Sequence, residues 1–221
     1  TMNCAPVLDV PAPGAHDIIG DRAYGEDAAT IVALGKAVAA GLMDGGVIPV
    51  IKHVPGHGRA TADSHLALPV VDADRRALEA SDFAPFKALA GMPAAMTAHV
   101  VFTAVDPSAP ASTSAKVTRE IIRGAIGFDG LLMSDDLSMK ALTGTMAERT
   151  RAVLDAGSDL ALHCNGALAE MAEVAAAAPA LAGKALTRFR RALDVTAATR
   201  PFDIAAAESA LAAVQAVKTV A

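Results

Sequence analysis

Short apolar runs alternate with longer segments of helical periodicity through the first three quarters of the chain, which limits the folds available to it. The apolar runs cover residues 2–10, 47–52, 94–102, 130–134 and 160–163. The helical segments between them cover residues 28–43, 74–89, 118–126 and 148–156. Strands that alternate with helices are joined by right-handed crossovers and pair in parallel. The pattern therefore predicts an α/β fold with helices packed on a parallel sheet.

The rest of the chain, residues 168–221, is rich in alanine and predicts helices interrupted at Pro179 and Pro201. No linker divides the chain, so we expect one domain over residues 1–221. With 53% hydrophobic and 19% charged residues, the chain can bury a core and is not of the disordered class. A net charge of −5 argues against binding to nucleic acid or to a membrane surface.

The two cysteines, Cys4 and Cys164, are too far apart in sequence to make a Cys-x-x-Cys metal site or a disulfide framework. Their number and spacing favour a reducing, cytoplasmic compartment. No apolar run has the length that a transmembrane helix requires. The oligomeric state is left open by these features.

Polar side chains follow the expected strands, at the point where each strand ends. They are Asp9, Lys52, His53, His99, Ser134, Asp135, Asp136, His163, Cys164 and Asn165. The carboxyl ends of parallel strands lie at one edge of a sheet or one mouth of a barrel. A single such residue is often a helix cap or a solvated side chain, but the recurrence indicates a functional site.

The densest polar segment covers residues 52–65 and contains three histidines. One interpretation is a metal site made by His53, His57, Asp63 and His65. The His-x-x-x-His spacing suits zinc only on a helix, which Pro55 and Gly56 would break. A second interpretation pairs Asp63 with His65 for acid–base catalysis, the carboxylate fixing the tautomer of the imidazole. A solvated polar loop is the third.

An apolar run delivers two adjacent carboxylates, Asp135 and Asp136, to its end. Successive residues of a strand point to opposite sides, so only one of them can face the interior of a barrel. That one is a candidate nucleophile, and the other is expected to bond to nearby backbone, lysine or arginine. A pair of helix-capping aspartates is the alternative.

These segments together resemble glycoside hydrolase family 3, in particular its NagZ-type β-N-acetylglucosaminidases. The family pattern K-H-F-P-G-H-G…D-S-H-x-x-L-P stands here at residues 52–58 and 63–69, with Val54 in place of phenylalanine. The other matching segments are S-D-D-L-S-M at 134–139, A-P-V-L-D-V at 5–10, I-I-G-x-R-x-[FY]-G at 18–25 and M-x-A-H-V at 96–100. The resemblance covers the chain to about residue 166.

The resemblance implies a (β/α)8 TIM-type barrel and a retaining double displacement, without a metal ion or other cofactor. Asp135 would be the nucleophile, and His65, polarised by Asp63, would be the acid/base. Lys52, His53 and Arg22 match positions that bind the hydroxyl groups of N-acetylglucosamine, and His99 and Asn165 would line the pocket. The implied substrates are small carbohydrates, N-acetylglucosaminyl-1,6-anhydro-N-acetylmuramic acid muropeptides, cleaved in the cytoplasm during cell-wall recycling.

The family barrel has eight strands, whereas this sequence predicts about five, beginning at the equivalent of the fourth. The D-x-E-G-G-x-V-x-R motif of the family's third strand does not occur. A barrel of this kind needs about 250 residues, and an incomplete one would leave open edges and an uncovered core. The sequence is therefore expected to be an N-terminally shortened form. Strands supplied by another chain, or a self-sufficient open sheet, are the other possibilities.

Two other functions remain open at this stage. One is a non-catalytic remnant that binds sugar weakly or not at all. The other is a different family 3 β-glycosidase, such as a β-glucosidase, against which the Asp63-Ser64-His65 motif argues because such relatives usually lack it.

Overall fold

The computed structural model describes residues 1–62, 64 and 67–218. Its strands are β1 (Met2–Asn3), β2 (Ile48–Val54), β3 (Val70–Val71), β4 (Ala94–Thr97), β5 (Val101–Phe102), β6 (Leu131–Asp136) and β7 (Leu160–Leu162). Its α-helices are α1 (Ala28–Asp44), α2 (Arg75–Ala80), α3 (Ala84–Ala88), α4 (Met146–Asp155), α5 (Leu168–Ala177), α6 (Gly183–Leu193) and α7 (Ile204–Lys218). Short 3₁₀ helices cover Gly20–Arg22, Ala111–Thr113 and Asp194–Ala197, and a π-helix covers Val117–Ala125.

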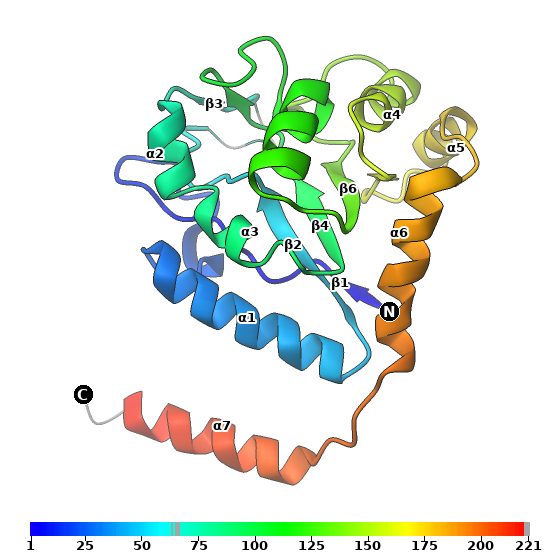
Figure 1. The fold of residues 1–221 in the computed structure, drawn as a ribbon. Helices are drawn as coiled ribbons and strands as arrows, with labels where there is room; N and C mark the ends of the chain where they lie inside the picture. The colour runs from blue at the N-terminus through cyan, green and yellow to red at the C-terminus, as the bar shows by residue number, and fades with distance from the viewer. Residues whose placement is uncertain (63, 65–66, 219–221) are drawn as a thin grey trace.

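Five strands form one parallel sheet in the order β1-β2-β4-β6-β7, and β3 pairs with β5 in a separate two-stranded sheet. The large sheet curls into a half-barrel (Figure 1). The prediction of five parallel strands joined through helices is confirmed. The carboxyl ends of all five strands therefore lie at one mouth, where the polar residues of the sequence were expected to gather.

The outer face of the half-barrel packs against the crossover helices. Ile51, Ala95 and Leu132 point outward from neighbouring strands into the main buried cluster. That cluster also contains Ile31 of α1, Phe86 of α3 and Ile121 of the π-helix. These apolar contacts hold the strands in the register that places the polar ends together.

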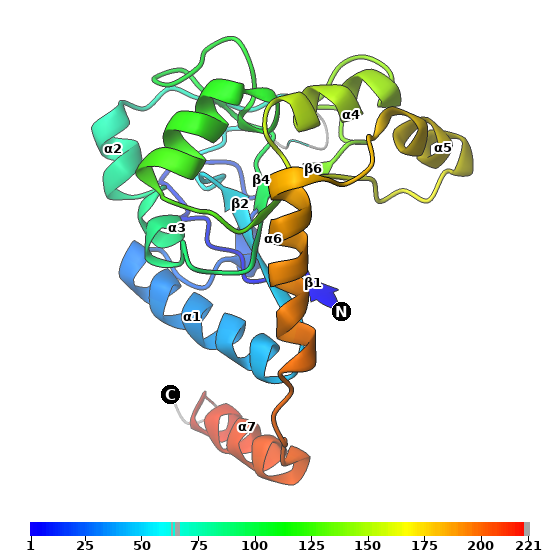
Figure 2. The same ribbon diagram turned by 45° about the vertical axis from the view of Figure 1, so that its right-hand side comes forward.

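The inner face of the half-barrel is covered by α6, as Figure 2 shows, where this helix passes in front of the strands. Val50, Met96 and Met133 point inward and form a second buried cluster with Ala192 and the half-buried Phe189. The sequence-based expectation that five strands would leave the core uncovered is therefore wrong for this face. The alanine-rich C-terminal region supplies the cover.

Three segments differ from their predicted form. The helix expected over residues 74–89 is two helices, α2 and α3, because Asp82 and Phe83 turn inward and are buried between them. The strand expected over residues 94–102 pairs as two strands in different sheets, β4 and β5. The strand expected over residues 2–10 is regular only at β1, with a further parallel bridge between Val7 and Lys52.

The helix expected over residues 118–126, capped by threonine, is the π-helix, and its cap is a different residue. Ser114 Oγ accepts a hydrogen bond from the backbone N–H of Val117 at 3.1 Å, and Thr118 lies inside the first turn. The C-terminal helices begin and end around Pro179 and Pro201 as predicted. In the described part of the chain, no helix combines the length and the apolar character that crossing a membrane requires.

Candidate active site

A cavity of about 130 Å³ lies at the carboxyl ends of β2 and β6. The residues that line it are Ile18, Ile19, Arg22, Lys52, His53, His57, Ser64, Asp135 and Met139. Four residues predicted to act on the sugar, Arg22, Lys52, His53 and Asp135, are thus brought to one place from three separate segments. This is the mouth at which sites of (β/α) barrels form.

Asp135 directly follows the buried part of β6, which ends at Ser134, and lines the cavity. Its side chain is 15% exposed, and Oδ2 lies 3.9 Å from Nε2 of His53. Its other oxygen, Oδ1, accepts a hydrogen bond from the backbone N–H of Asp136 at 2.8 Å. One carboxylate oxygen is held by the backbone and the other faces the open space, which is the arrangement that a nucleophile requires.

Asp136 points the other way, as the alternation along a strand dictates. Its Oδ1 accepts hydrogen bonds from the backbone N–H groups of Ser138 and Cys164, each at 3.0 Å, and Oδ2 accepts from the Ser138 hydroxyl. The expectation that one of the two carboxylates would bond to nearby backbone is confirmed. Asp136 thereby fixes the turn that follows β6.

Asp9 is a fully buried carboxylate directly behind His53. Its Oδ2 lies 2.7 Å from His53 Nδ1, and its Oδ1 accepts the backbone N–H groups of His53 at 3.1 Å and His57 at 2.7 Å. Burial by itself raises the pKa of Asp9, but the charge of His53 and its hydrogen bonds to the carboxylate outweigh this effect and lower the pKa. Asp9 is therefore ionised at neutral pH.

The loop after β2 packs tightly against the segment after Asp9. A Cβ atom at Gly58 would lie 1.9 Å from the carbonyl oxygen of Val10, so only glycine fits this close approach. The backbone N–H of Ala12 donates to the carbonyl of Gly58 at 3.0 Å. This close contact fixes the loop that carries His57, a residue that lines the cavity.

His57 connects this loop to the segment that carries the predicted acid/base pair. Its Nε2 lies 3.2 Å from Ser64 Oγ, and the carbonyl of Ser64 accepts the backbone N–H of Ala141 at 3.2 Å. Burial lowers the pKa of His57, which keeps this imidazole neutral. Asp63 and His65, which flank Ser64 in the sequence, lie outside the described residues.

His99 and Asn165, the remaining predicted binding residues, lie near the mouth but do not line this cavity. His99 is fully buried, with Nδ1 2.7 Å from Ser112 Oγ and Nε2 3.1 Å from the carbonyl oxygen of Asp136. Burial lowers its pKa, so it is neutral and supports the end of β6 from behind. Asn165 is exposed, and its side-chain amide donates to Glu170 at 2.6 Å.

Arg22 lies at the rim, where it shapes its own loop. Its Nη2 donates to the carbonyl of Ile18 at 2.6 Å and its Nε to the carbonyl of Ile19 at 3.3 Å. Lys52 is half-buried on β2 beside His53. The two cations line the cavity together with the anionic Asp135.

The metal interpretation named His53, His57, Asp63 and His65, of which the last two are not described. Within residues 1–62, 64 and 67–218, no group of three or more histidine, cysteine, aspartate or glutamate side chains is arranged to hold a metal ion. The ring of His53 already faces Asp9 through Nδ1 and Asp135 through Nε2. His53 is thus hydrogen-bonded to Asp9 at 2.7 Å and lies 3.9 Å from Asp135, an arrangement of a histidine between two carboxylates.

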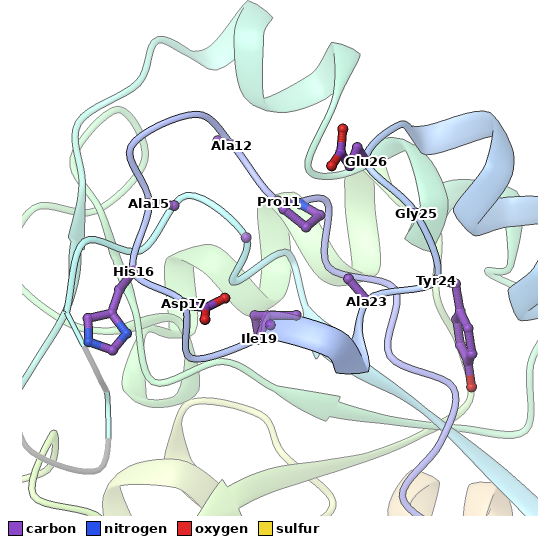
Figure 3. Close-up of a pocket in the computed structure, with 12 residues that line it drawn as sticks. Pro11, Ala12, Ala15, His16, Asp17, Ile19, Ala23, Tyr24, Gly25 and Glu26 are labelled. Carbon is purple, nitrogen blue, oxygen red and sulfur yellow. The ribbon is translucent and has the colours of Figure 1, made fainter.

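A larger cavity, of about 480 Å³, lies on the other side of Ile19, which lines both cavities. Figure 3 shows the segment from Pro11 to Glu26 wrapped around it. Its polar side chains, among them His16, Asp17 and Glu26, are exposed. The smaller cavity is the better candidate for chemistry, because the buried histidines and the carboxylate of Asp135 converge on it.

Sequence reasoning missed two participants in this arrangement. Asp9 was noted only as one of several polar residues at strand ends, and His57 was considered only as a metal ligand. Their partners are 44 and 48 residues from Asp9 in the chain, so no local pattern reveals the contacts. The signal that could have found Asp9 is a lone carboxylate inside the apolar run of residues 5–10.

Comparison with known proteins gives one consistent result. Residues 1–191 match the family described as Glycosyl hydrolase family 3 N terminal domain. A β-hexosaminidase of Alkalilimnicola ehrlichii is 44% identical over 165 residues, which are 73% of this chain and 47% of that protein. The chain spans about half the length of the curated relatives it matches.

Two solved structures extend the comparison to the fold. A glycoside hydrolase family 3 β-N-acetylglucosaminidase from Paenibacillus sp. FPU-7 matches with a TM-score of 0.82 and 32% identity, over 92% of this chain and 41% of that one. NagZ from Neisseria gonorrhoeae, in complex with N-trifluoroacetyl-D-glucosamine, matches with a TM-score of 0.76 and 35% identity, over 86% of this chain and 55% of that one.

Proposed function

The chain belongs to glycosyl hydrolase family 3, and from this membership and the site geometry we propose that it acts as a retaining β-N-acetylglucosaminidase. The observation that carries the proposal is the placement of Asp135. Its free oxygen faces His53 at the carboxyl end of a barrel strand, in a cavity also lined by Lys52 and Arg22. The small volume of the cavity suits a single terminal sugar ring.

In the proposed reaction, an Asp135 oxygen attacks the anomeric carbon while the glycosidic bond breaks and its electron pair leaves with the aglycone oxygen. His65 gives its proton to that oxygen. His65 then takes a proton from water, whose oxygen attacks the anomeric carbon and releases the Asp135 carboxylate. Two inversions give net retention. The histidine replaces the second carboxylate of most glycosidases and can lose and regain a proton near neutral pH.

The groups around Asp135 have the charges that this chemistry requires. Positive charge develops on the sugar as the bond breaks, and the carboxylate stabilises it while also forming the covalent bond. Lys52, His53 and Arg22 are proposed to bind the sugar hydroxyls. Ser64 is anchored by His57 at the edge of the cavity, and this anchor supports the proposed roles of its neighbours Asp63 and His65.

The proposed substrates are N-acetylglucosaminyl muropeptides of the 1,6-anhydro type, cleaved in the cytoplasm during cell-wall recycling. The resemblance to the NagZ-type enzymes supports this class of substrate. The N-acetylglucosamine analogue bound by the gonococcal relative supports the sugar. Cys4 and Cys164 are both free thiols, which is compatible with a reducing compartment.

The test is hydrolysis of 4-nitrophenyl N-acetyl-β-D-glucosaminide by the purified, folded chain, with 4-nitrophenyl β-D-glucoside as the comparison substrate. Asp135→Asn should reduce kcat by about 10⁴-fold, because the neutral amide is no longer a nucleophile. Asp129→Asn, which removes an exposed carboxylate at the opposite end of β6, should retain wild-type activity. A chelator should have no effect, and the first sugar released should have the β configuration by NMR.

Other outcomes would identify the alternatives. A folded sample without turnover would favour the non-catalytic remnant, and preference for the glucoside would favour a β-glucosidase. Activity retained by Asp135→Asn would remove Asp135 as the nucleophile. Release of N-acetylglucosamine from a 1,6-anhydro disaccharide, followed by mass spectrometry, tests the finer substrate assignment.

A further inference from the structure

Asp9 holds a position that the proposed reaction does not use directly. Its side chain is 0% exposed, and no part of it lines the candidate cavity. The backbone around it is fixed, since Leu8 N–H donates to the carbonyl of Lys52 at 2.7 Å and Val7 forms a parallel bridge with the same residue. The carboxylate is therefore held rigidly against the end of β2.

Each oxygen of Asp9 has a different task. Oδ2 faces the ring of His53, at 2.7 Å from Nδ1. Oδ1 accepts two backbone N–H groups, those of His53 at 3.1 Å and His57 at 2.7 Å. An ionised carboxylate can only accept hydrogen bonds, so Nδ1 of His53 must carry the proton. The opposite ring nitrogen, Nε2, is then directed at Asp135.

The second oxygen reaches the other half of the site through His57. The amide of this residue is held by Asp9, and its ring lies 3.2 Å from the hydroxyl of Ser64. In the sequence, Ser64 stands between His65, the proposed acid/base, and Asp63, the residue proposed to polarise it. One buried carboxylate thus contacts both the histidine beside the nucleophile and the first turn of the loop that leads to the acid/base segment.

We propose that Asp9 is a positioning residue that ties the nucleophile side of the site to the acid/base loop, through His53 on one oxygen and the amide of His57 on the other. The inference rests on the proposed function for its catalytic consequence. Its structural part, the proton on Nδ1 of His53, can be tested without any turnover.

Two substitutions separate the two tasks. In Asp9→Asn the two backbone N–H groups require the amide oxygen at the Oδ1 position, so the NH₂ group must face His53. A donor then meets the Nδ1–H donor, and the proton of His53 moves to Nε2. The loop contact to His57 survives in this variant. In Asp9→Ala both tasks are lost.

Kinetics with leaving groups of different basicity report each task. A good leaving group departs without a proton, so kcat/KM for such a substrate, which reports the first step, depends on the nucleophile side alone, whereas kcat/KM for a poor leaving group also depends on the acid. Asp9→Asn should lower kcat/KM by about 10²-fold for both 2,4-dinitrophenyl and 4-methoxyphenyl N-acetyl-β-glucosaminides. Asp9→Ala should lower kcat/KM for the 4-methoxyphenyl substrate at least about 10-fold further than kcat/KM for the dinitrophenyl substrate.

The matched control is Asp159→Asn. Asp159 is also a buried carboxylate with one backbone and two side-chain donors, but it lies at the opposite end of the sheet. This variant should lose stability without changing the ratio of the two kcat/KM values. If Asp9→Asn and Asp9→Ala behave as Asp159→Asn does, with a wild-type ratio of the two kcat/KM values and wild-type kcat/KM per folded molecule, the positioning role is overturned.

A spectroscopic measurement keeps the inference testable if the variants unfold or the chain has no turnover. Long-range ¹H–¹⁵N NMR of the wild-type chain should show His53 protonated at Nδ1, with its signal identified by its loss in His53→Gln. Asp9→Asn should shift the proton to Nε2, and Asp159→Asn should leave it on Nδ1. A wild-type His53 protonated only at Nε2 would refute the proposal, whatever the outcome of the activity assays.

Discussion

Both ends of the half-barrel contain buried aspartates, but these aspartates pair with histidine at one end and with arginine at the other. At the carboxyl ends of the strands, Asp9 and Asp135 face the ring of His53. At the amino ends, the buried Asp159 accepts hydrogen bonds from Arg123 at 3.0 Å and from Arg188 at 3.1 Å. The acid is the same, and the partner determines what the pair can do.

Arginine keeps its proton in proteins, so the pairs at the amino ends have a permanent charge. They also link distant elements, because Arg188 comes from α6 and bonds both to Asp159, just before β7, and to Asp129, just before β6. Since α6 covers the inner face of the sheet, these pairs fix the helix over the core. This end of the barrel is built for stability.

Histidine changes charge near neutral pH, so the carboxyl ends can redistribute protons. There the ring of His53 lies between Asp9, at 2.7 Å, and Asp135, at 3.9 Å, and the neutral rings of His57 and His99 bond to neighbouring parts of the site. The difference between the ends therefore teaches that the same acid forms a fixed ion pair at one end and, beside histidine, a pair that can take part in the proposed chemistry at the other.

Among the substitutions that test this comparison, Asp159→Ala should have the largest effect, a loss of stability. Removal of the carboxylate leaves the guanidinium of Arg123, 17% exposed, without its ionic partner. Breaking a buried pair in this way should cost about 3 kcal/mol of unfolding free energy. Urea unfolding measures the loss, and Tm should fall by roughly 10 °C.

The same variant should leave kcat per folded molecule unchanged, because the hydrogen-bond donors to Asp159 are Arg123, Arg188 and Leu132, and these three do not line the candidate cavity. Asp135→Asn is the opposite case, with lost activity and little lost stability. A large drop in the activity of folded Asp159→Ala would show that the two ends are coupled, and the division of roles between them would fail.

The local part of this architecture could be predicted from the sequence, because apolar periodicity is set by neighbouring residues. The strands and the position of Asp135 at a strand end follow from such patterns. The break between α2 and α3 does not, because it depends on a distant contact. Asp82 is drawn inward to bond Arg59 at 2.6 Å, and these residues are 23 positions apart.

The surface covered by α6 and the contacts of Asp9 also depend on residues that are distant in the sequence. Phe189 and Ala192 recur at helical spacing on α6, which predicts an apolar face but not the surface that it covers. Asp9 belongs to an apolar run and has no local partner for its charge. Its contacts arise only when β2 has been placed beside it, so the hub of the candidate site is a product of tertiary structure.

A smaller effect concerns the pH dependence of the unfolding free energy, which we expect to arise from histidines at the carboxyl ends and not from the pairs at the amino ends. Burial lowers the pKa of both His57 and His99 in the folded chain. Below the ordinary histidine pKa of about 6.5, the unfolded chain therefore binds protons that the folded chain does not. The unfolding free energy should be greatest above this pH and should fall as the pH decreases toward 5.

Urea unfolding of the wild type, His99→Asn and Asp159→Ala at pH 5, 6 and 7 measures this dependence. His99→Asn removes one titrating group at the carboxyl end, so its stability should change less with pH. Asp159→Ala should be less stable at every pH but keep the wild-type slope. If His99→Asn also keeps the wild-type slope, His99 is not a source of the acid sensitivity.

The smallest effect concerns the reactivity of Cys164, whose thiol senses the electrostatic potential at the carboxyl ends of the strands. Burial, with the negative charges of Asp136 and Asp135, raises the pKa of this thiol to about 11. Because the thiolate is the reactive form, alkylation by iodoacetamide at pH 8 should be roughly 10²-fold slower than that of an unperturbed cysteine. Mass spectrometry of a Cys4→Ser background follows the single remaining thiol.

Adding Asp135→Asn to this background should lower the pKa of Cys164 and speed its alkylation, because one of the negative charges that oppose the thiolate is gone. Adding Asp159→Ala instead should leave the rate unchanged, since that carboxylate lies at the other end of the strands and is neutralised by arginine. Equal rates in all three backgrounds would mean that burial alone controls the thiol. The negative charges of Asp135 and Asp136 would then not be felt at Cys164.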